Sequence, residues 1–420
     1  MGNGLDILIV NPNNKIVSPF SATEPPLWAG LIASHYKNQG QRIAILDAEA
    51  GDLTVEQTAE AIKNTNPRQV IIVVMGNNPS VSSTAKMLTT KRITESLDGT
   101  NVAVTGLHPL ALPYETESEL GVPVLKCEPY KSMPNIPWEL LPMDKYKAHN
   151  WHCLDGSPRS PYAIVYTSLG CPFNCSFCNI HALYGGSHKV WYREPIEVIK
   201  EIDTLVTKYN VRNIKFWDEL FTLNGKHIKY ICLELIKRQY NLNIWAYARV
   251  DSPSISLNIL KLMKLAGINW LSYGFESGNN NVLEASNKKA SRAEAIKAVC
   301  MTHDAGINIL GNFIFGLPGD TKETMQETLD FAKSLKIEYV NFYVAKAYPG
   351  SKIYEGNEDW ASYNQFGKDN SEVSKFRNKA FIEFFTDPDY VYHIGNKFGE
   401  QAVRQTRAML EFGKPVTRSG

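Results

Sequence analysis

The chain has 420 residues, a formal net charge of +1 at pH 7 and 44% hydrophobic residues. This length gives room for two or three domains, and the composition is ordinary for a globular protein. A charge so close to zero gives no reason to expect nucleic acid or an anionic membrane surface as a partner. No apolar run approaches the ~20 residues that span a bilayer, and residues 1–6 lack the basic start of a signal peptide. We therefore expect a cytoplasmic protein without membrane insertion.

Residues 1–140 alternate apolar runs with helical stretches. The runs at 6–10, 42–47, 69–75 and 101–106 predict buried parallel strands, and the stretches between them predict helices on both faces of the sheet. Ligands of such doubly wound sheets bind beyond the carboxyl ends of the strands. The residues that we expect there are Asn11, Gly76, Asn77, Gly106 and His108.

Proline-rich residues between 129 and 161 predict an irregular crossing, of which we take 141–160 as the linker between domains. Two tryptophans of this segment, Trp138 and Trp151, are expected to pack at the domain interface. An apolar run at 163–168 then predicts the first strand of a second α/β domain.

Three cysteines follow that strand directly: Cys171, Cys175 and Cys178, with C-x3-C-x2-C spacing. Thiolates so close together need a cation, and an iron–sulfur cluster suits them. Three ligands leave one iron of a four-iron cluster open for a substrate or cofactor. Two alternatives are a structural zinc site completed by His181 and three unligated core cysteines.

This spacing, with Phe177 just before the third cysteine, resembles the radical S-adenosylmethionine (SAM) superfamily. The resemblance implies a [4Fe–4S] cluster on the three cysteines and SAM chelated to the fourth iron by its amino and carboxylate groups. It also implies one-electron cleavage of SAM to methionine and a 5′-deoxyadenosyl radical. The electron would come from an external donor of the flavodoxin or ferredoxin type.

From 161 to 351 the strand–helix rhythm has a longer period, with strands expected near 163, 213, 243, 269, 308 and 339. Six units are too few for a closed eight-stranded barrel and are similar to the partial (β/α)6 barrel of that superfamily. Aromatic-rich residues 352–420 are expected to form a small C-terminal cap that closes the barrel mouth. The predicted fold class is therefore α/β: a Rossmann-like domain, a partial barrel and a cap.

Acidic and basic residues stand at the expected ends of the second and third barrel strands. Asp218 and Glu219 resemble the family's acidic acceptors for the SAM amino group, which presents donors with positive character. Arg249 is placed, by the same resemblance, to contact the SAM carboxylate. A surface acidic pair and an Arg249–Asp251 structural pair are the alternatives.

The next two strand ends carry further family-like motifs. Glu276 and Ser277 lie in a Gly-x-Glu-Ser-Gly sequence, whose carboxylate usually approaches the ribose hydroxyls in the family. Gly316 and Pro318 belong to a glycine-containing turn that resembles the one packed near adenine. This turn lacks the Gly-Lys-Ser/Thr of a phosphate-binding loop.

Joined to such a barrel, residues 1–140 resemble the cobalamin-binding domain of one radical SAM class. The similar pieces are residues 25–27, 46–48 and 106–113. The Asp-x-His-x-x-Gly signature of other cobalamin proteins is absent, so no lower axial ligand is assigned. His108 is the nearest candidate for a corrin contact, and a solvent-exposed loop histidine is the alternative.

The resemblance as a whole implies a cobalamin-dependent C-methyltransferase that acts on an unactivated carbon of a small molecule, through a 5′-deoxyadenosyl radical and methylcobalamin. One alternative is radical SAM chemistry without methyl transfer, such as cyclisation, epimerisation or oxidation, with cobalamin structural or absent. A non-catalytic corrinoid- or metal-binding protein is the alternative of a different class. The substrate is not identified by the sequence.

Overall fold

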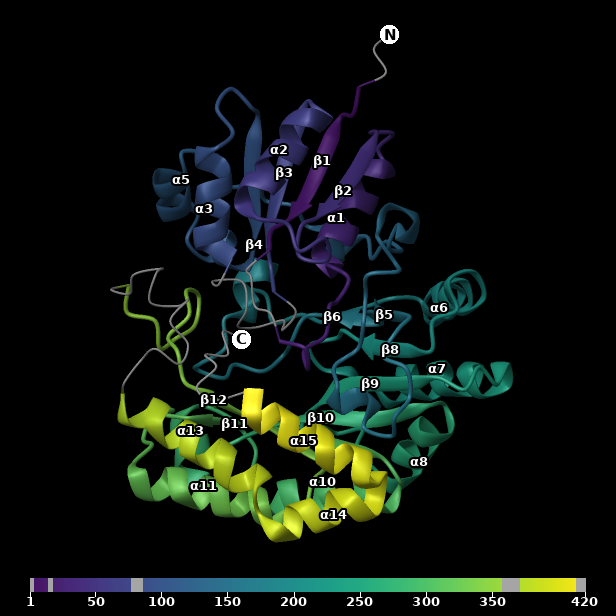
Figure 1. Ribbon diagram of the computed structural model, residues 1–420, viewed down its shortest axis with the longest axis vertical. Helices are drawn as coiled ribbons and strands as arrows, with labels where there is room; N and C mark the ends of the chain where they lie inside the picture. The colour runs from purple at the N-terminus through teal and green to yellow at the C-terminus, as the bar shows by residue number, and fades with distance from the viewer. Residues whose placement is uncertain (1–3, 14–17, 77–85, 357–370, 413–420) are drawn as a thin grey trace.

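The computed structural model describes residues 4–13, 18–76, 86–356 and 371–412. It places a four-stranded parallel sheet at one end of the molecule and a six-stranded parallel sheet at the other (Figure 1). Asn77, one of the expected cofactor residues, lies outside the described residues. In those residues no helix combines the length and the apolar character that crossing a bilayer requires.

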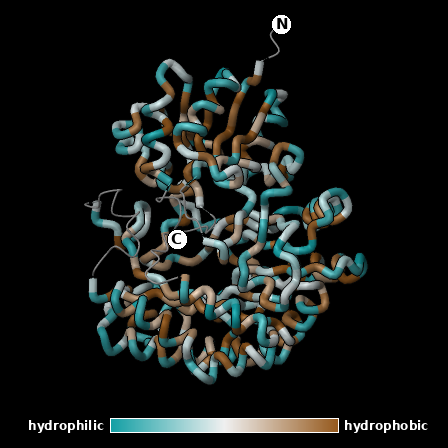
Figure 2. The backbone as a smooth tube through the Cα atoms, in the orientation of Figure 1, coloured by the Kyte–Doolittle hydropathy of each residue, from teal (hydrophilic) through white to brown (hydrophobic). Residues whose placement is uncertain are grey.

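The N-terminal sheet has the strand order β2-β1-β3-β4, with every pair parallel. Its elements are β1 (Ile7–Asn11), α1 (Leu27–Lys37), β2 (Ile43–Asp47), α2 (Val55–Thr65), β3 (Gln69–Val74), α3 (Met87–Glu95), β4 (Val102–Gly106), α4 (Leu107–Ala111) and α5 (Pro113–Leu120). On β1, Ile7 and Ile9 pack with α1 on one face of the sheet, and Leu8 and Val10 pack with α2 and α3 on the other. The strands are therefore predominantly hydrophobic, with polar residues at their ends (Figure 2), and the doubly wound prediction is confirmed.

A topological switch point lies between β1 and β3. The chain passes from β1 to one edge strand, β2, and from β3 to the other edge strand, β4. Helices leave the two neighbouring strands toward opposite faces of the sheet, which opens a crevice at their carboxyl ends. Asn11 and Gly76 mark these ends.

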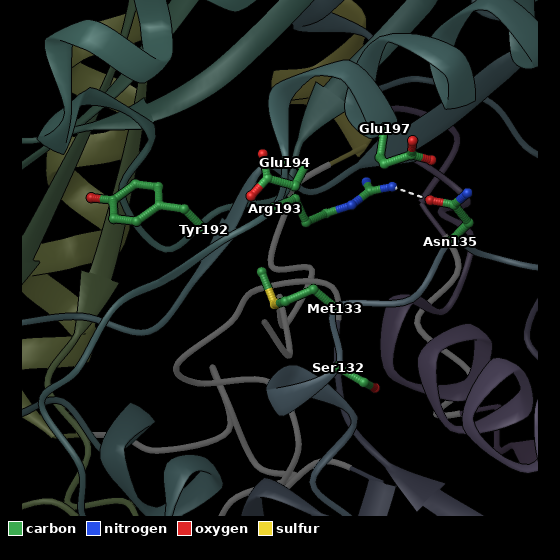
Figure 3. Close-up of a pocket in the computed structure, with 7 residues that line it drawn as sticks. All are labelled: Ser132, Met133, Asn135, Tyr192, Arg193, Glu194 and Glu197. Atoms are coloured by element: carbon green, nitrogen blue, oxygen red, sulfur yellow. Dashed lines mark hydrogen bonds between the residues drawn. The ribbon is translucent and has the colours of Figure 1, made fainter.

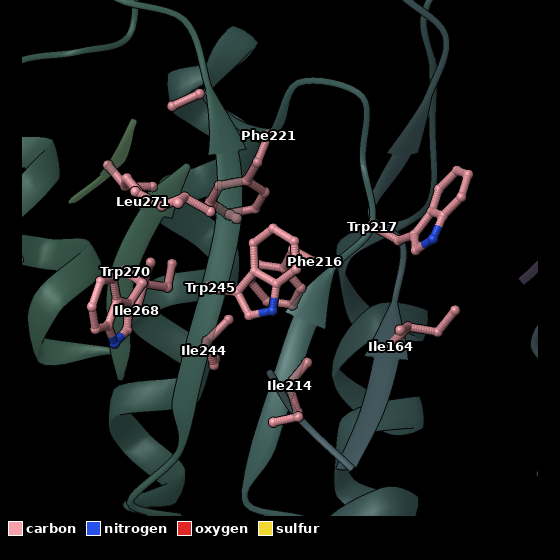
Figure 4. Close-up of a cluster of buried hydrophobic side chains, with 14 of the residues drawn as sticks. Ile164, Ile214, Phe216, Trp217, Phe221, Ile244, Trp245, Ile268, Trp270 and Leu271 are labelled. Carbon is pink, nitrogen blue, oxygen red and sulfur yellow. The ribbon is translucent and has the colours of Figure 1, made fainter. Parts of the chain in front are cut away.

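The second sheet has the order β12-β11-β10-β9-β8-β5 and is also parallel throughout. Its strands are β5 (Tyr162–Val165), β8 (Asn213–Phe216), β9 (Asn243–Ala248), β10 (Ile268–Glu276), β11 (Asn308–Phe315) and β12 (Tyr339–Val344). The helices between them are α6 (Pro195–Tyr209), α7 (Gly225–Arg238), α8 (Leu257–Leu265), α9 (Asn280–Ala285), α10 (Arg292–Asp304) and α11 (Lys322–Ser334). Ile214, Phe216 and Ile244 belong to the buried apolar cluster of these strands (Figure 4). The six-unit partial barrel matches the expectation.

The predicted strand at 163–168 is split in the structure. β5 ends at Val165, and β6 (Ser168–Leu169) pairs instead with β7 (Trp191–Tyr192) in a separate antiparallel ribbon. The strand breaks here because its backbone groups bond to side chains. The Tyr166 carbonyl accepts a hydrogen bond from the Arg193 guanidinium at 2.8 Å, and the Thr167 amide donates to the Asp218 carboxylate. Short 3-10 helices occupy the linker and loops: η2 (Pro129–Lys131), η3 (Trp138–Leu140), η4 (Trp151–Cys153), η5 (Ile180–Tyr184) and η6 (Phe221–Leu223).

Both tryptophans of residues 129–161 pack against the barrel, and their packing at the domain interface stays a prediction. The Trp138 indole donates to Glu201 of α6 at 2.8 Å. Trp151 lies at the amino ends of the barrel strands, with ring centroids 5.3 Å from Trp245 and 5.2 Å from Trp270. These aromatic rings form an apolar floor on the inner face of the barrel.

A fully buried ion pair joins the two domains. Glu24, just before α1, accepts a hydrogen bond from Lys215 of β8 at 2.7 Å and one from the Tyr162 hydroxyl at 2.7 Å. Both charged side chains are 1% exposed. Because each charge is buried, each depends on the other for compensation.

The C-terminal helices contradict the expected position of the cap. α13 (Glu372–Phe385) starts beside Gly316 at the barrel mouth and packs along β12. α14 (Pro388–Phe398) and α15 (Glu400–Phe412) lie at the opposite end, where Phe398 stacks on Trp270 and Lys397 binds Glu338 at 2.6 Å. Trp270 and Glu338 stand at the amino ends of strands, so these two helices cover the floor rather than the mouth.

Substitution Lys215→Met should destabilise the protein by about 3–5 kcal/mol, because it leaves the Glu24 carboxylate buried and unpaired. The double variant Glu24→Gln/Lys215→Met should recover part of this loss. Urea unfolding followed by tryptophan fluorescence measures both. The exposed pair Lys200–Glu197 supplies the control, since Lys200→Met should cost no more than about 0.5 kcal/mol. Equal effects of the two methionine variants would contradict the assigned role of the buried pair.

Glu338 should make stability depend on pH. Its burial raises the pKa, but His303, His393 and Lys397 outweigh burial and leave the pKa well below the ordinary value. A carboxylate with a depressed pKa stabilises the fold above its unfolded pKa of about 4.3, and this contribution is lost as pH falls below that value. Glu338→Gln should therefore lower the urea midpoint at pH 7, and the difference from wild type should shrink as the pH falls from about 4.3 toward about 3. A difference that stays constant over this range would count against the ion pair.

Candidate active site

The three cysteines lie on a loop fixed from several sides. Gly170 opens it with φ +101°, and a Cβ there would lie 2.2 Å from the Lys189 carbonyl oxygen, so only glycine fits. In the loop, the Ser176 amide donates to the Ser286 carbonyl and the Ser176 carbonyl accepts from the Lys352 amide, both at 2.9 Å. The loop is therefore held against the segments that follow α9 and β12.

The thiols of this loop are free and half-buried. Burial raises the pKa of Cys171 to about 11, and burial together with the charge of Cys171 raises the pKa of Cys178. Thiolates here therefore require a cationic partner, which the irons of a cluster provide. No set of three or more His, Cys, Asp or Glu side chains in the described residues is arranged around a single metal ion. A four-iron cluster does not need such convergence, because each thiolate binds its own iron.

The acidic pair at the end of β8 holds the cysteine loop. Asp218 is fully buried and accepts hydrogen bonds of 2.6 Å from the Thr167 amide, the Thr167 hydroxyl and the Ser168 hydroxyl. Glu219 accepts from the Gly170 amide at 2.8 Å and from the Tyr184 hydroxyl. Burial raises the pKa of Asp218 to about 6 and that of Glu219 to about 7. Contact of either carboxylate with the SAM amino group stays a prediction.

Arg249 reaches the cysteine loop from the end of β9. Its guanidinium makes a two-point ion pair with Asp251 at 2.7 and 2.8 Å. The same group donates to the Cys175 sulfur at 3.4 Å and lies 3.8 Å from the centroid of the Phe173 ring. The alternative of an Arg249–Asp251 pair is therefore present, and it also presents a fixed positive charge beside the loop. A SAM carboxylate contact is compatible with this position and stays a prediction.

Glu276 ends β10 in an unusual backbone conformation, with φ +64°. Its carboxylate pairs with Lys288 at 2.8 Å, and Lys288 is 3% exposed. Gly274 leaves room for this pair, since a Cβ there would lie 2.4 Å from the Glu276 carboxylate. Nothing in the local sequence pattern around Lys288 connects it to Glu276. The pair lies on the same barrel end as the cysteines.

The remaining expected SAM residues shape turns at the barrel mouth. The Ser277 hydroxyl lies 3.1 Å from that of Thr328 and accepts from the Asn279 amide. Gly316 has φ +81°, its amide donates to Asp320 at 2.8 Å, and Pro318 lies in the same turn. Phe177 is half-buried within the cysteine loop. Their contacts with a ligand stay predictions.

A buried polar network lies at the carboxyl ends of β1 and β2. Asn11 donates to Asp47 at 2.8 Å and accepts from Lys86 at 2.7 Å, and the Tyr146 hydroxyl donates to Asp47 at 2.8 Å. Lys86 also pairs with Glu49 at 2.8 Å. The sequence analysis missed Lys86 and Tyr146, because nothing in their local pattern connects them to Asn11. The Asn11 side chain is thus occupied within the protein.

Helix α4 brings the first domain into contact with the cysteine segment. Gly106 precedes it with φ +119°, and a Cβ there would lie 2.3 Å from the Val74 carbonyl oxygen. α4 packs on η5, the turn after the cysteines. His108 of α4 is fully buried, and burial lowers its pKa to about 3, so the imidazole is neutral. The alternative of a solvent-exposed loop histidine is therefore wrong, and a corrin contact stays a prediction.

A narrow cavity lies between the two sheets at the switch point. Asn11, Met75 and Gly76 line it from the first domain and Trp217 from the end of β8. Residues 25–29 complete its wall. The sequence analysis did not select Trp217 as a site residue. Its position directly before Asp218 and Glu219 is the one sequence signal that could have indicated its place in the cavity. Figure 4 shows its indole beyond the end of β8.

A second, open depression lies over the linker and β7 (Figure 3). Its lining includes Met133, Asn135 and Tyr192. The Arg193 guanidinium holds the lining residue Asn135 in place, because it donates hydrogen bonds to Asn135 and, at 2.6 Å, to Glu201. None of the residues expected to bind the cluster or SAM lines this depression, and we assign it no ligand.

Comparison with known proteins agrees with this geometry. Residues 165–332 match the family model described as the radical SAM superfamily. The barrel segment of the chain therefore carries a radical SAM domain. The matched segment begins at the last residue of β5 and ends in α11, so it includes the cysteine loop and the four barrel strands β8 to β11.

Two relatives and one solved structure extend the comparison. An uncharacterized methyltransferase of Pyrococcus horikoshii is 29% identical over 91% of this chain and 93% of its own length. The bacteriochlorophyllide d C-8(2)-methyltransferase of Chlorobaculum tepidum is 31% identical, but the match covers 56% of this chain and only 55% of that relative. The radical SAM methyltransferase TsrM of Kitasatospora setae, solved with cobalamin and a [4Fe–4S] cluster, shares the fold with a TM-score of 0.65 and 16% identity, over 84% of this chain and 77% of TsrM.

Substitution Cys175→Ala should remove the cluster, since only two of the three thiolate ligands would remain. After anaerobic reconstitution, iron analysis should give about four irons per chain for wild type and less than one for the variant. Cys300→Ala is the matched control, because Cys300 is exposed on α10. Retention of the full iron content by Cys175→Ala would contradict the assignment.

Proposed function

We propose that the protein is a cobalamin-dependent radical SAM C-methyltransferase that acts on an unactivated carbon of a small molecule. The observation that carries this proposal is the cavity between the two sheets. There the switch-point residues Asn11 and Gly76 face Trp217, which directly precedes the acidic pair behind the cysteine loop. The binding edge of one domain therefore faces the cysteine end of the other, as a reaction with two cofactors requires.

The residues present fit the two groups. Cys171, Cys175 and Cys178 would hold the cluster, and Arg249 presents a fixed positive charge 3.4 Å from the Cys175 sulfur for the SAM carboxylate. Gly76 lines the switch-point cavity at a strand end, which is where a doubly wound sheet would bind a corrin. When bound, these groups would supply the reductive cleavage of SAM and a carrier for the methyl group.

The protein's own contribution is to fix and seal the site. Asp218 and Glu219 hold the strand end and the amide that precede Cys171. Trp28 of α1 packs on Tyr184 of η5 with centroids 6.1 Å apart, and Tyr184 packs on Trp191 at 5.5 Å. Trp28 and Tyr184 are buried and Trp191 is half-buried, so these rings exclude water where the first domain meets the cysteine segment.

The partners follow from the same proposal. A one-electron donor of the flavodoxin or ferredoxin type would approach the cysteine loop, where Pro172 and Asn174 are exposed. Free thiols and a reducible cluster suit a reducing cytoplasm.

Metal analysis and labelled SAM test the proposal together. Protein reconstituted anaerobically with hydroxocobalamin should contain about four irons and one cobalt per chain, and methyl-labelled SAM should transfer label to carbon of a small molecule from a cell extract. Bound iron without cobalt, and reductive cleavage of SAM without label transfer, would favour cyclisation, epimerisation or oxidation. Zinc in place of iron would exclude both.

A further inference from the structure

The inner face of the barrel is ordered in layers. Strand register places Trp245, Trp270 and Asn308 in one layer, next to the apolar floor. Two residues further along the strands, Tyr247 pairs with Ser272. The next layer contains Gly274, Asn312 and Asn341, and Glu276 and Arg249 follow near the cysteine loop. A polar band therefore lies between the floor and the expected cofactor residues.

Hydrogen bonds across three strands orient one amide in this band. Asn312 of β11 donates to the Ser272 hydroxyl at 2.8 Å and to the Tyr273 carbonyl at 3.1 Å. The Asn312 carbonyl oxygen accepts from the Asn341 amide of β12 at 3.2 Å. Asn341 is half-buried, and its carbonyl oxygen makes no hydrogen bond within the described residues. Its position is thus fixed while an acceptor and a second N–H stay available.

A phenol stands one layer below. Tyr247 of β9 is half-buried, and its ring lies 5.1 Å from that of Trp245. In the described part of the chain its hydroxyl has no hydrogen-bond partner, although Lys215 lies 5.5 Å from the ring centroid. Asn341 and Tyr247 therefore both present unused neutral hydrogen-bonding groups to the inner face.

The charges that border this band are compensated. Lys215 pairs with Glu24 at 2.7 Å, Arg249 with Asp251 at 2.7 Å, and Glu276 with Lys288 at 2.8 Å. A charged substrate group would thus meet no unpaired counter-charge among these residues, and its desolvation would be unfavourable. An uncharged group that needs both a donor and an acceptor is favoured instead.

We propose that the substrate carries a neutral amide, either a carboxamide or a lactam, which Asn341 and Tyr247 recognise on the inner face of the barrel. This inference rests on the proposed function, since it places the substrate between the cysteine loop and the apolar floor. Asn341 offers the amide a complementary donor and acceptor. Tyr247 adds a hydroxyl one layer deeper.

Ligand-detected NMR on anaerobically reconstituted protein with SAM tests the proposal. The probes are nicotinamide, nicotinate and 3-acetylpyridine, three rings of similar size that carry an amide, a carboxylate and a ketone. At about 10 mM, a probe with a Kd near 1 mM is close to saturation. Nicotinamide should bind. Nicotinate and 3-acetylpyridine should bind at least about tenfold more weakly, because neither carries the N–H donor of the amide. Preference for nicotinate, or no binding of nicotinamide, would overturn the proposal.

Variants locate the binding. Asn341→Leu should weaken nicotinamide binding about tenfold, and Tyr247→Phe should weaken it less. Asn308→Leu is the matched control, because Asn308 lies on the inner face of β11 beside the floor and should leave binding unchanged. Unchanged binding in Asn341→Leu would overturn the proposal. An equal loss in the control would do the same.

Two further readouts separate this inference from the proposed function. Each variant should retain the wild-type iron content and the reductive cleavage of SAM to 5′-deoxyadenosine. If wild type holds the cluster and cleaves SAM but fails the probe test, the amide assignment alone is wrong. If Asn341→Leu weakens SAM binding and not nicotinamide binding, the Asn341 side chain contacts SAM rather than the substrate, and the proposal is overturned. Absence of the cluster from wild type would refute the proposed function itself.

Discussion

The buried pair of Glu24 and Lys215 is the constraint on which the arrangement of the two domains depends. Neither charge reaches water, so each domain holds a group that is stable only when the other domain is in place. Glu24 directly precedes the prolines that line the switch-point cavity, and Lys215 stands two residues before Trp217 on β8. The interaction that joins the domains therefore lies next to residues that line the cavity between them.

A second constraint acts on the cysteine loop. Three thiolates without a cation repel one another, so the loop must be fixed by contacts other than the ligands themselves. Asp218 and Glu219 provide these contacts, because they accept hydrogen bonds from the backbone amides of Thr167 and Gly170. Burying these carboxylates raises the pKa of each, a cost that the surrounding hydrogen bonds offset only in part. Buried carboxylates with raised pKa values are expected at sites that hold reactive groups in a fixed geometry, and less so in parts of a protein that only stabilise the fold.

Much of this architecture could be predicted because apolar runs and strand-end motifs are local signals. The four strands of the first domain and the six of the barrel follow from such runs. Local signals failed where distant residues decide the structure. The strand at 163–168 is interrupted by Arg193 and Asp218, which are not adjacent in the sequence. The final helices cover the floor because Glu338 binds Lys397, a contact that no periodicity reveals.

The side chains on the inner face of the barrel change in character from the amino ends of the strands to their carboxyl ends. The aromatic floor provides packing, whereas the charged pairs Arg249–Asp251 and Glu276–Lys288 lie near the cysteines, where we propose that the cofactors bind. Between them, Asn341 is oriented by Asn312, which is in turn oriented by Ser272. An amide held in this way cannot easily rotate to suit a different partner, because rotation would break the bond to Asn312. A fixed donor and acceptor therefore select the substrate's polar group and, through it, the carbon that lies toward the cysteine loop.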